Sequence, residues 1–167
     1  AVVPVAHPYL IAKGVHAHGI RQVKGLLLIP LRDADGVLWN VQTIAPDGTK
    51  RFLSGGRKRG LYHGIGASVT GLLCVAVGYA TAASVHEATG YPVAAAFDCG
   101  NLESVAKVLR AKYPQVMITI CADNDVHTPG NPGLTKATIA ARVIGGNVAI
   151  PPDGYNDFND AMQEEPA

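Results

Sequence analysis

LLCVAV at residues 72–77, PVAAAF at 92–97 and VMITICAD at 116–123 are three short apolar runs that decide the fold. Helical stretches lie between them and after the third, and a last apolar run, NVAI, occupies residues 147–150. Unbroken apolar runs are typical of strands buried on both faces, and helices between them imply parallel crossovers. The pattern predicts a layered α/β domain with a parallel sheet flanked by helices.

The first third of the chain has a different pattern, in which apolar segments alternate with tight-turn signals. KGLLLIPL at residues 24–31 and VLWNVQTI at 37–44 are separated by RDADG, and a second turn, PDG, precedes KRFL. Asp-Gly pairs supply the positive φ that hairpin turns need. We therefore expect turns at Asp35-Gly36 and Asp47-Gly48 within a small antiparallel meander.

A glycine- and arginine-rich stretch separates the two patterns. Residues 54–64, SGGRKRGLYHG, have little periodicity and are predicted to form a loop. We accordingly divide the chain into a β-rich module with a basic loop at residues 1–66 and the α/β domain at 67–167. Within that domain, Gly90 is expected to end one helix and Asn101 to cap the start of another.

Composition narrows the class of protein without identifying it. The 167 residues are 48% hydrophobic, which is enough for a core, and the formal net charge is only +1. No apolar run reaches the roughly 18 residues of a membrane span, and the first ten residues lack the pattern of a signal peptide. We expect a cytoplasmic protein with no membrane partner, whose three cysteines, none in a CxxC pair, are reduced core residues.

Carboxylates gather where two predicted strands end. Asp123 and Asp125 directly follow the third apolar run, and Asp157 lies beyond the fourth. The carboxyl ends of parallel strands are where α/β sheets bind ligands, and Mg²⁺ binds to one or two carboxylates while phosphates and water complete its shell. A metal site and a solvated turn are both open for Asp123 and Asp125, and Asp157 is either a further ligand or, as its setting favours, part of a surface turn or helix cap.

Basic residues are concentrated in and beside the predicted loop. A phosphate- or nucleic-acid-binding role is expected for them, since the neighbouring glycines permit close backbone approach, but a solvated loop has the same composition. A lysine after the paired aspartates is a further candidate. The residues are Lys50, Arg51, Arg57, Lys58, Arg59 and Lys136.

Other chemistries lack their motifs. His16, His18 and His86 have no third ligand at a suitable spacing for zinc and are expected to be structural or surface residues. There is no GxSxG elbow, Walker loop or GxGxxG fingerprint, which argues against hydrolase, ATPase and dinucleotide-binding functions.

Taken together, VGYATA after the first strand, AFDCGNL at residues 96–102 and the strand that ends in Asp-Asn-Asp resemble a toprim domain over residues 72–160. The chain is most similar to the DNA primases of phages, plasmids and other mobile elements, in which an Asp-Phe-Asn-Asp segment also occurs. The resemblance implies that Asp123 and Asp125 are catalytic and hold Mg²⁺ or Mn²⁺. It also places Asp157 where related primases have another acid.

One motif position departs from the family. The toprim glutamate that ends the first strand is Val77 here, and valine neither binds a metal nor accepts a proton. Loss of such a group costs roughly 10²- to 10⁴-fold in rate. Glu87 lies too far along the next helix to be an obvious substitute.

The resemblance implies a primase core that joins nucleoside triphosphates into an RNA primer on a single-stranded DNA template. A zinc-binding module and a helicase commonly accompany such cores, and we expect them elsewhere in a larger protein. Two alternatives remain open at this point: a degenerate, non-catalytic toprim module that binds metal and nucleic acid, and a toprim nuclease or topoisomerase that cleaves DNA.

Overall fold

The computed structural model describes residues 2–3 and 6–163. Residues 164–167, the end of the predicted α/β domain, lie outside the described part. In chain order the elements are α1 (Pro8–Lys13), β1 (Arg21–Val23), β2 (Leu26–Arg32), β3 (Leu38–Ile44), β4 (Lys50–Phe52), β5 (His63–Ile65), β6 (Leu72–Ala76), α2 (Tyr79–Thr89), β7 (Val93–Ala95), a 3₁₀ turn η1 (Cys99–Asn101), α3 (Leu102–Lys112), β8 (Met117–Cys121), α4 (Pro132–Ile144), β9 (Asn147–Ala149) and α5 (Phe158–Gln163). None of the helices described is long and apolar enough to cross a bilayer.

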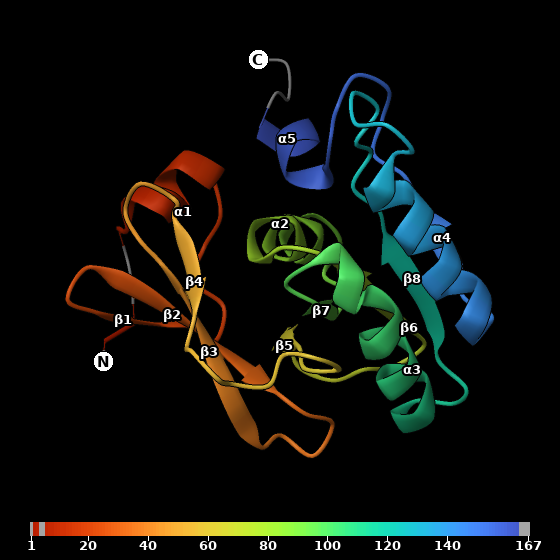
Figure 1. Ribbon diagram of the computed structural model, residues 1–167, viewed down its shortest axis with the longest axis horizontal. Helices are drawn as coiled ribbons and strands as arrows, with labels where there is room; N and C mark the ends of the chain where they lie inside the picture. Colours follow the sequence, from red (N-terminus) through yellow and green to blue (C-terminus); the bar gives the residue numbers. More distant parts are fainter. Residues whose placement is uncertain (1, 4–5, 164–167) are drawn as a thin grey trace.

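The strands form two sheets, which stand side by side in Figure 1. The first is an antiparallel meander in the order β1-β2-β3-β4, as the turn signals predicted. The second has the order β5-β7-β6-β8-β9, in which β7, β6, β8 and β9 are mutually parallel. The predicted α/β architecture with a preceding antiparallel module is therefore confirmed.

The loop prediction for residues 54–64 was wrong at its end. β5 begins at His63 and pairs antiparallel with β7, so it extends the second sheet by one edge strand. Residues 63–65 carry no strand periodicity because the middle one is Gly64. The open edge of β7 supplies the hydrogen bonds that make this segment a strand, and that edge exists only in the folded chain.

Alternation along the central strands divides the core into two layers. Leu73 and Val75 of β6 face α3 and α4, whereas Cys74 and Ala76 face α2 and the antiparallel module. Cys74 and Cys121 are buried, and all three cysteines are free thiols, as expected for reduced core residues.

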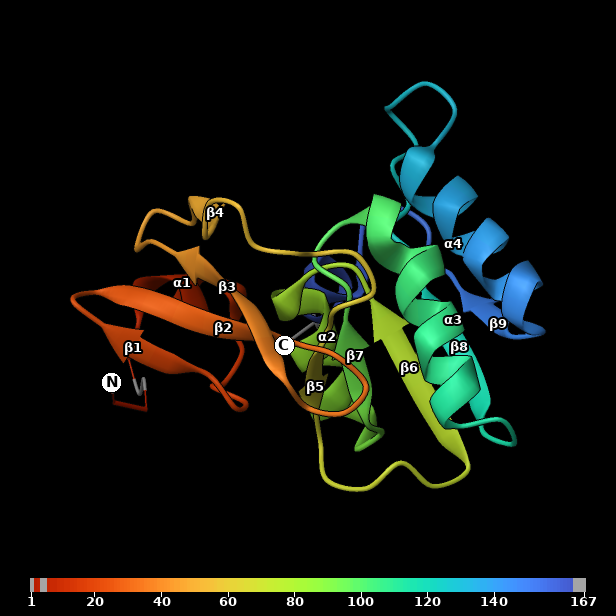
Figure 2. The same cartoon turned by 60° about the horizontal axis from the view of Figure 1, so that its bottom comes forward.

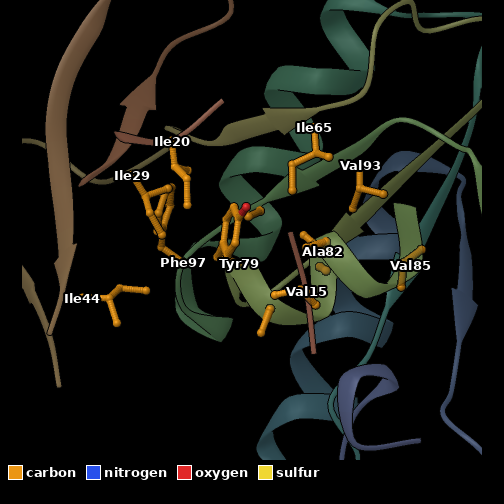
Figure 3. Packing of buried hydrophobic residues seen from close by; sticks show 14 of the residues in the cluster. Val15, Ile20, Ile29, Ile44, Ile65, Tyr79, Ala82, Val85, Val93 and Phe97 are labelled. Atoms are coloured by element: carbon orange, nitrogen blue, oxygen red, sulfur yellow. The ribbon is translucent and has the colours of Figure 1, made fainter. Parts of the chain in front are cut away.

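One hydrophobic core joins the module to the α/β sheet. Ile20, Ile29 and Ile44 from the module meet Tyr79 and Phe97 from the α/β domain, and Figure 3 shows the two sets of side chains packed face to face. The division at residue 66 stays a prediction about the sequence, but the two parts share this buried contact.

A single buried asparagine fastens the basic loop to the α/β domain. The side-chain amide of Asn101 donates to the carbonyls of Lys58, Leu61 and Ala96, and its Oδ1 accepts from the backbone N–H of Gly60. Asn101 occupies the N-cap position of α3, as predicted, but its side chain makes no capping hydrogen bond. The cap expectation was therefore right in position only, because Oδ1, the atom that would accept a capping hydrogen bond, accepts from the backbone N–H of Gly60 instead.

We expect Asn101→Ala to lower the free energy of unfolding by about 2 to 4 kcal/mol, because it leaves several buried backbone groups without partners. Urea denaturation followed by circular dichroism measures this. Gln115→Ala, at an exposed turn, is the control and should change stability by less than about 0.5 kcal/mol. Equal losses in the two variants would contradict the proposed fastening role.

Candidate functional site

The ends of the parallel strands bring the predicted acids to one edge. Asp123 lies two residues beyond β8, and Asp157 precedes α5 in the connection that follows β9. The backbone N–H of Asn124 donates to the carbonyl of Asn156 at 2.6 Å, which ties the two acidic segments together. Sequence reasoning therefore located this edge, although the hydrogen bond between the segments was not foreseeable.

The pKa of the Asp123 carboxyl group is strongly shifted at this edge. Burial, followed by the negative charges of Asp157 and Asp125, raises its pKa to about 7, while Lys50 acts in the opposite direction. Its Oδ1 is buried and has no hydrogen-bond partner in the protein. A buried carboxylate oxygen left unpaired among like charges fits a cation ligand, because a cation removes both penalties.

Asp125 is held by the start of α4. Its Oδ2 accepts from the backbone N–H of Gly133 at 3.0 Å, and its own N–H donates to Oδ1 of Asn131 at 2.9 Å. Asn131 also donates to the side chain of Asn124, and it adopts a left-handed φ of 40° that asparagine tolerates better than most residues. These hydrogen bonds fix the position of the Asp125 carboxylate at the amino end of α4.

Sequence reasoning missed Asn131 and Gly133, although a signal was present. Asn-Pro before an apolar helical stretch is a capping pattern, with proline in the first turn. The need for glycine at 133 had no such signal. A Cβ there would lie 2.6 Å from the carbonyl oxygen of Asp123 and 2.7 Å from Oδ2 of Asp125. The helix α4 therefore rests directly on the loop that carries these two aspartates, called the acidic loop below.

The antiparallel module contributes two groups to this edge. Lys50 lies within electrostatic reach of Asp157 and Asp123, and its ammonium lies 5.7 Å from the ring centre of Tyr9. Its pKa is lowered by partial desolvation and by Lys13, against the effect of the two acids. The hydroxyl of Tyr9 is buried and unpaired, and its pKa is raised to about 12 by burial and by Asp157. Tyr9 was not a candidate from sequence.

The remaining predicted basic residues do not converge on the acids. Arg51 is next to Lys50 on β4 and so points to the opposite face of the sheet. Arg57 stacks on Trp39, Lys58 lies over Phe52, and Arg59 donates to the hydroxyl of Ser104. The predicted Lys136 is exposed on α4. Its charge contributes to the lowered pKa of Glu103 on α3, after the larger effect of Lys107.

Val77 directly follows β6, at the edge where Asp123 lies. Its side chain is packed against the core layer under α3 and α4. Glu87, the other acid considered for this position, does not lie beside Val77. It lies nine residues along α2 from Gly78, about 13 Å at the helical rise, and its carboxylate accepts from His16 and His18.

The histidine contacts agree with the structural role expected from sequence. Among residues 2–3 and 6–163, no set of three or more His, Cys, Asp or Glu side chains is arranged to hold a metal ion. Since Mg²⁺ needs only one or two protein carboxylates, the sheet edge that carries Asp123, Asp125 and Asp157, called the acidic edge below, fits a weakly held ion.

Comparison with known proteins agrees with this geometry. Residues 72–167 match the family model described as Toprim domain, so the chain belongs to the toprim family. It is 43% identical to two Escherichia coli proteins named DNA primase TraC, over 90% of this chain in each case. The resemblance to primase toprim domains seen in the sequence is therefore confirmed.

Solved primase structures share the fold. The primase domains of bacteriophage T7 gp4 bound to an RNA/DNA hybrid and dTTP match 92% of this chain and 83% of theirs, with a TM-score of 0.69 and 19% identity. A DnaG primase catalytic domain bound to ssDNA matches 94% of this chain and 54% of its own, with a TM-score of 0.56 and 16% identity. The chain spans only 16% and 11% of the two TraC relatives.

We expect Gly133→Ala to destabilise the protein by about 1 to 3 kcal/mol, because its methyl group overlaps the acidic loop and forces α4 to shift. Thermal unfolding measures the loss. Gly64→Ala is the matched control, since a Cβ there meets nothing within 4 Å. Unchanged stability in Gly133→Ala would show that α4 does not rest on this loop.

The raised pKa of Asp123 predicts a pH-dependent stability. Its folded-state pKa of about 7 exceeds the usual 3.8, so its contribution is present below pH 4 and is lost as the pH rises to 7. Asp123→Asn should therefore stabilise the protein relative to wild type by an amount that grows over this window, towards about 4 kcal/mol. Urea denaturation at several pH values gives this difference. A difference that does not change with pH would contradict the assigned shift.

Proposed function

We propose that this chain is the metal-dependent nucleotidyl-transfer core of a DNA primase. The observation that carries the proposal is the buried, unpaired carboxylate oxygen of Asp123 beside Asp125 and Asp157. Such an edge attracts a divalent cation, and the phosphates of an incoming nucleoside triphosphate would satisfy the rest of its coordination. The 43% identity to proteins named DNA primase supports the same reaction.

The chain's own residues have distinct roles in this proposal. Asp123 and Asp125 hold Mg²⁺ or Mn²⁺, and Asp157 adds charge at the rim of the site. When bound, the cation would supply charge stabilisation for the transferring phosphoryl group. Lys50 neutralises phosphate from the module side, where it already faces these acids. Loss of the water around this amine and these acids strengthens each of these attractions.

Partners follow from the same reaction. Arg57, Lys58 and Arg59 attract the phosphates of a single-stranded DNA template, and this attraction weakens as salt rises. Arg51 and Lys136 lie outside the acidic edge, so we assign them at most general electrostatic attraction. Because the chain spans a small part of its TraC relatives, we place a zinc-binding or helicase region elsewhere in the full protein.

A second candidate function is favoured by Val77. With an apolar side chain at the third acidic position, the edge can bind metal and nucleic acid without turning over. DNA cleavage by a nuclease or topoisomerase keeps the same fold but has no specific observation in its favour among the described residues.

We expect Val77→Glu to increase primer synthesis on single-stranded DNA with ribonucleotides and Mn²⁺ by roughly 10²- to 10⁴-fold, because it restores the missing ligand or proton acceptor. The assay measures labelled primers after gel separation. Val77→Gln is the matched control. Glutamine has nearly the same shape as glutamate but no charge, so this variant should give no increase in primer synthesis.

Other outcomes decide between the candidates. Efficient synthesis by the wild-type chain, abolished by Asp123→Ala, would show that Val77 does not limit catalysis. No synthesis by any variant, with Mn²⁺ binding that Asp123→Ala removes, would favour the non-catalytic module.

A further inference from the structure

Trp39 is an exposed aromatic residue that neither the core nor the acidic edge uses. It is the only tryptophan in the sequence, and 49% of it is exposed although it lies in β3. Its neighbours Val37 and Leu38 are exposed to a similar extent, at 50% and 49%. Exposed apolar surface that gathers in one place often marks a contact site.

The indole ring is held in a fixed orientation. Its Nε1–H donates to Oδ2 of Asp33 at 2.6 Å, and Oδ1 of the same carboxylate accepts from the backbone N–H groups of Asp35 and Val37, both at 3.0 Å. The guanidinium of Arg57 lies 4.4 Å from the ring centre and covers one face. The ring is therefore already positioned before any partner arrives, which reduces the entropy cost of binding.

The sheet face around Trp39 combines apolar and basic groups. Trp39, Val41 and Thr43 alternate along β3 on the face turned away from the buried Asn40 and Gln42. Beside Val41, a hollow of about 240 Å³ is lined by Leu28 and Pro30 and flanked by arginines. These arginines are Arg21 and Arg32, both exposed.

The basic loop connects this surface with the α/β domain. Arg57 stacks on Trp39, Lys58 follows, and Arg59 contacts Ser104 in the first turn of α3, at the edge where the parallel strands end. Figure 2 shows the segment after β4 crossing from the antiparallel sheet to the beginning of α3. Asp33 and Asp35 are the acidic groups beside the indole, and Asp33 is already engaged by Trp39 and lies 4.0 Å from Arg57.

We infer that Trp39, backed by Arg57, is a stacking platform for an unpaired base of single-stranded DNA. A flat ring with a cation behind it, on a sheet face flanked by arginines, matches the two requirements of a flexible polyanion with exposed bases: stacking and phosphate neutralisation. An apolar protein partner would leave these cations unpaired. The inference rests on the proposed function and deepens it, because it names a contact for the template that is separate from the acidic edge.

Fluorescence of the single tryptophan tests this directly. Titration of the chain with oligo(dT) should quench Trp39 emission, whereas an abasic oligonucleotide of equal length and charge should bind more weakly without quenching. Trp39→Ala should weaken oligo(dT) binding by about 5- to 150-fold, measured by anisotropy of a labelled strand, and Trp39→Phe should recover most of that loss. Circular dichroism checks that each variant is folded.

Asp123→Asn separates this inference from the proposed function. It should abolish primer synthesis while oligo(dT) quenching stays unchanged. If oligo(dT) binds but leaves the emission unaltered, or binds Trp39→Ala as tightly as wild type, the platform is refuted even if priming is intact. If quenching occurs but no variant makes primers, the platform stands and the catalytic proposal fails.

Discussion

Like charges packed at the edge of a sheet repel one another, and burial strengthens the repulsion. Asp123 is held close to other acids because the loops after β8 and β9 are joined by a hydrogen bond between Asn124 and Asn156. Burial first, and then the charges of Asp157 and Asp125, raise the pKa of Asp123, and its Oδ1 is buried without a hydrogen-bond partner. Much of the surrounding structure holds this unfavourable arrangement in place, including the glycine contact of α4 and the opposing charge of Lys50.

The module and the α/β domain depend on each other through this edge. Lys50 reaches the acids only because its sheet packs against Tyr79 and Phe97, and the basic loop keeps its course because Asn101 binds its carbonyls. The positive charge of Lys50 therefore lies on the module side of this edge, and the negative charges of the acids lie on the α/β side. In the proposed function this arrangement holds a polyphosphate between them, since such a ligand carries charge that both sides can neutralise once a cation is present.

Valine at position 77 is compatible with the toprim fold. The strand, its successor helix and the acidic loop all form with valine at this position, because its side chain packs well on the neighbouring core layer. The chain thus has the toprim architecture, and in our proposal valine stands where the family motif carries a charged group. In the proposed function, stability and catalysis place different demands on this residue, and an apolar side chain meets only the demand of stability.

The sequence by itself determined the two architectures and the position of the acids. Apolar runs and turn residues report on each segment's local environment, and the carboxyl ends of parallel strands necessarily share an edge. Only the tertiary structure decided which basic residues face that edge. Lys50 and Arg51 are neighbours in sequence but lie on opposite faces of β4, and β5 is a strand only because β7 offers it an edge. Asn101, Asn131 and Gly133 acquired their roles in the same way, because their partners lie on segments that come together only when the chain folds.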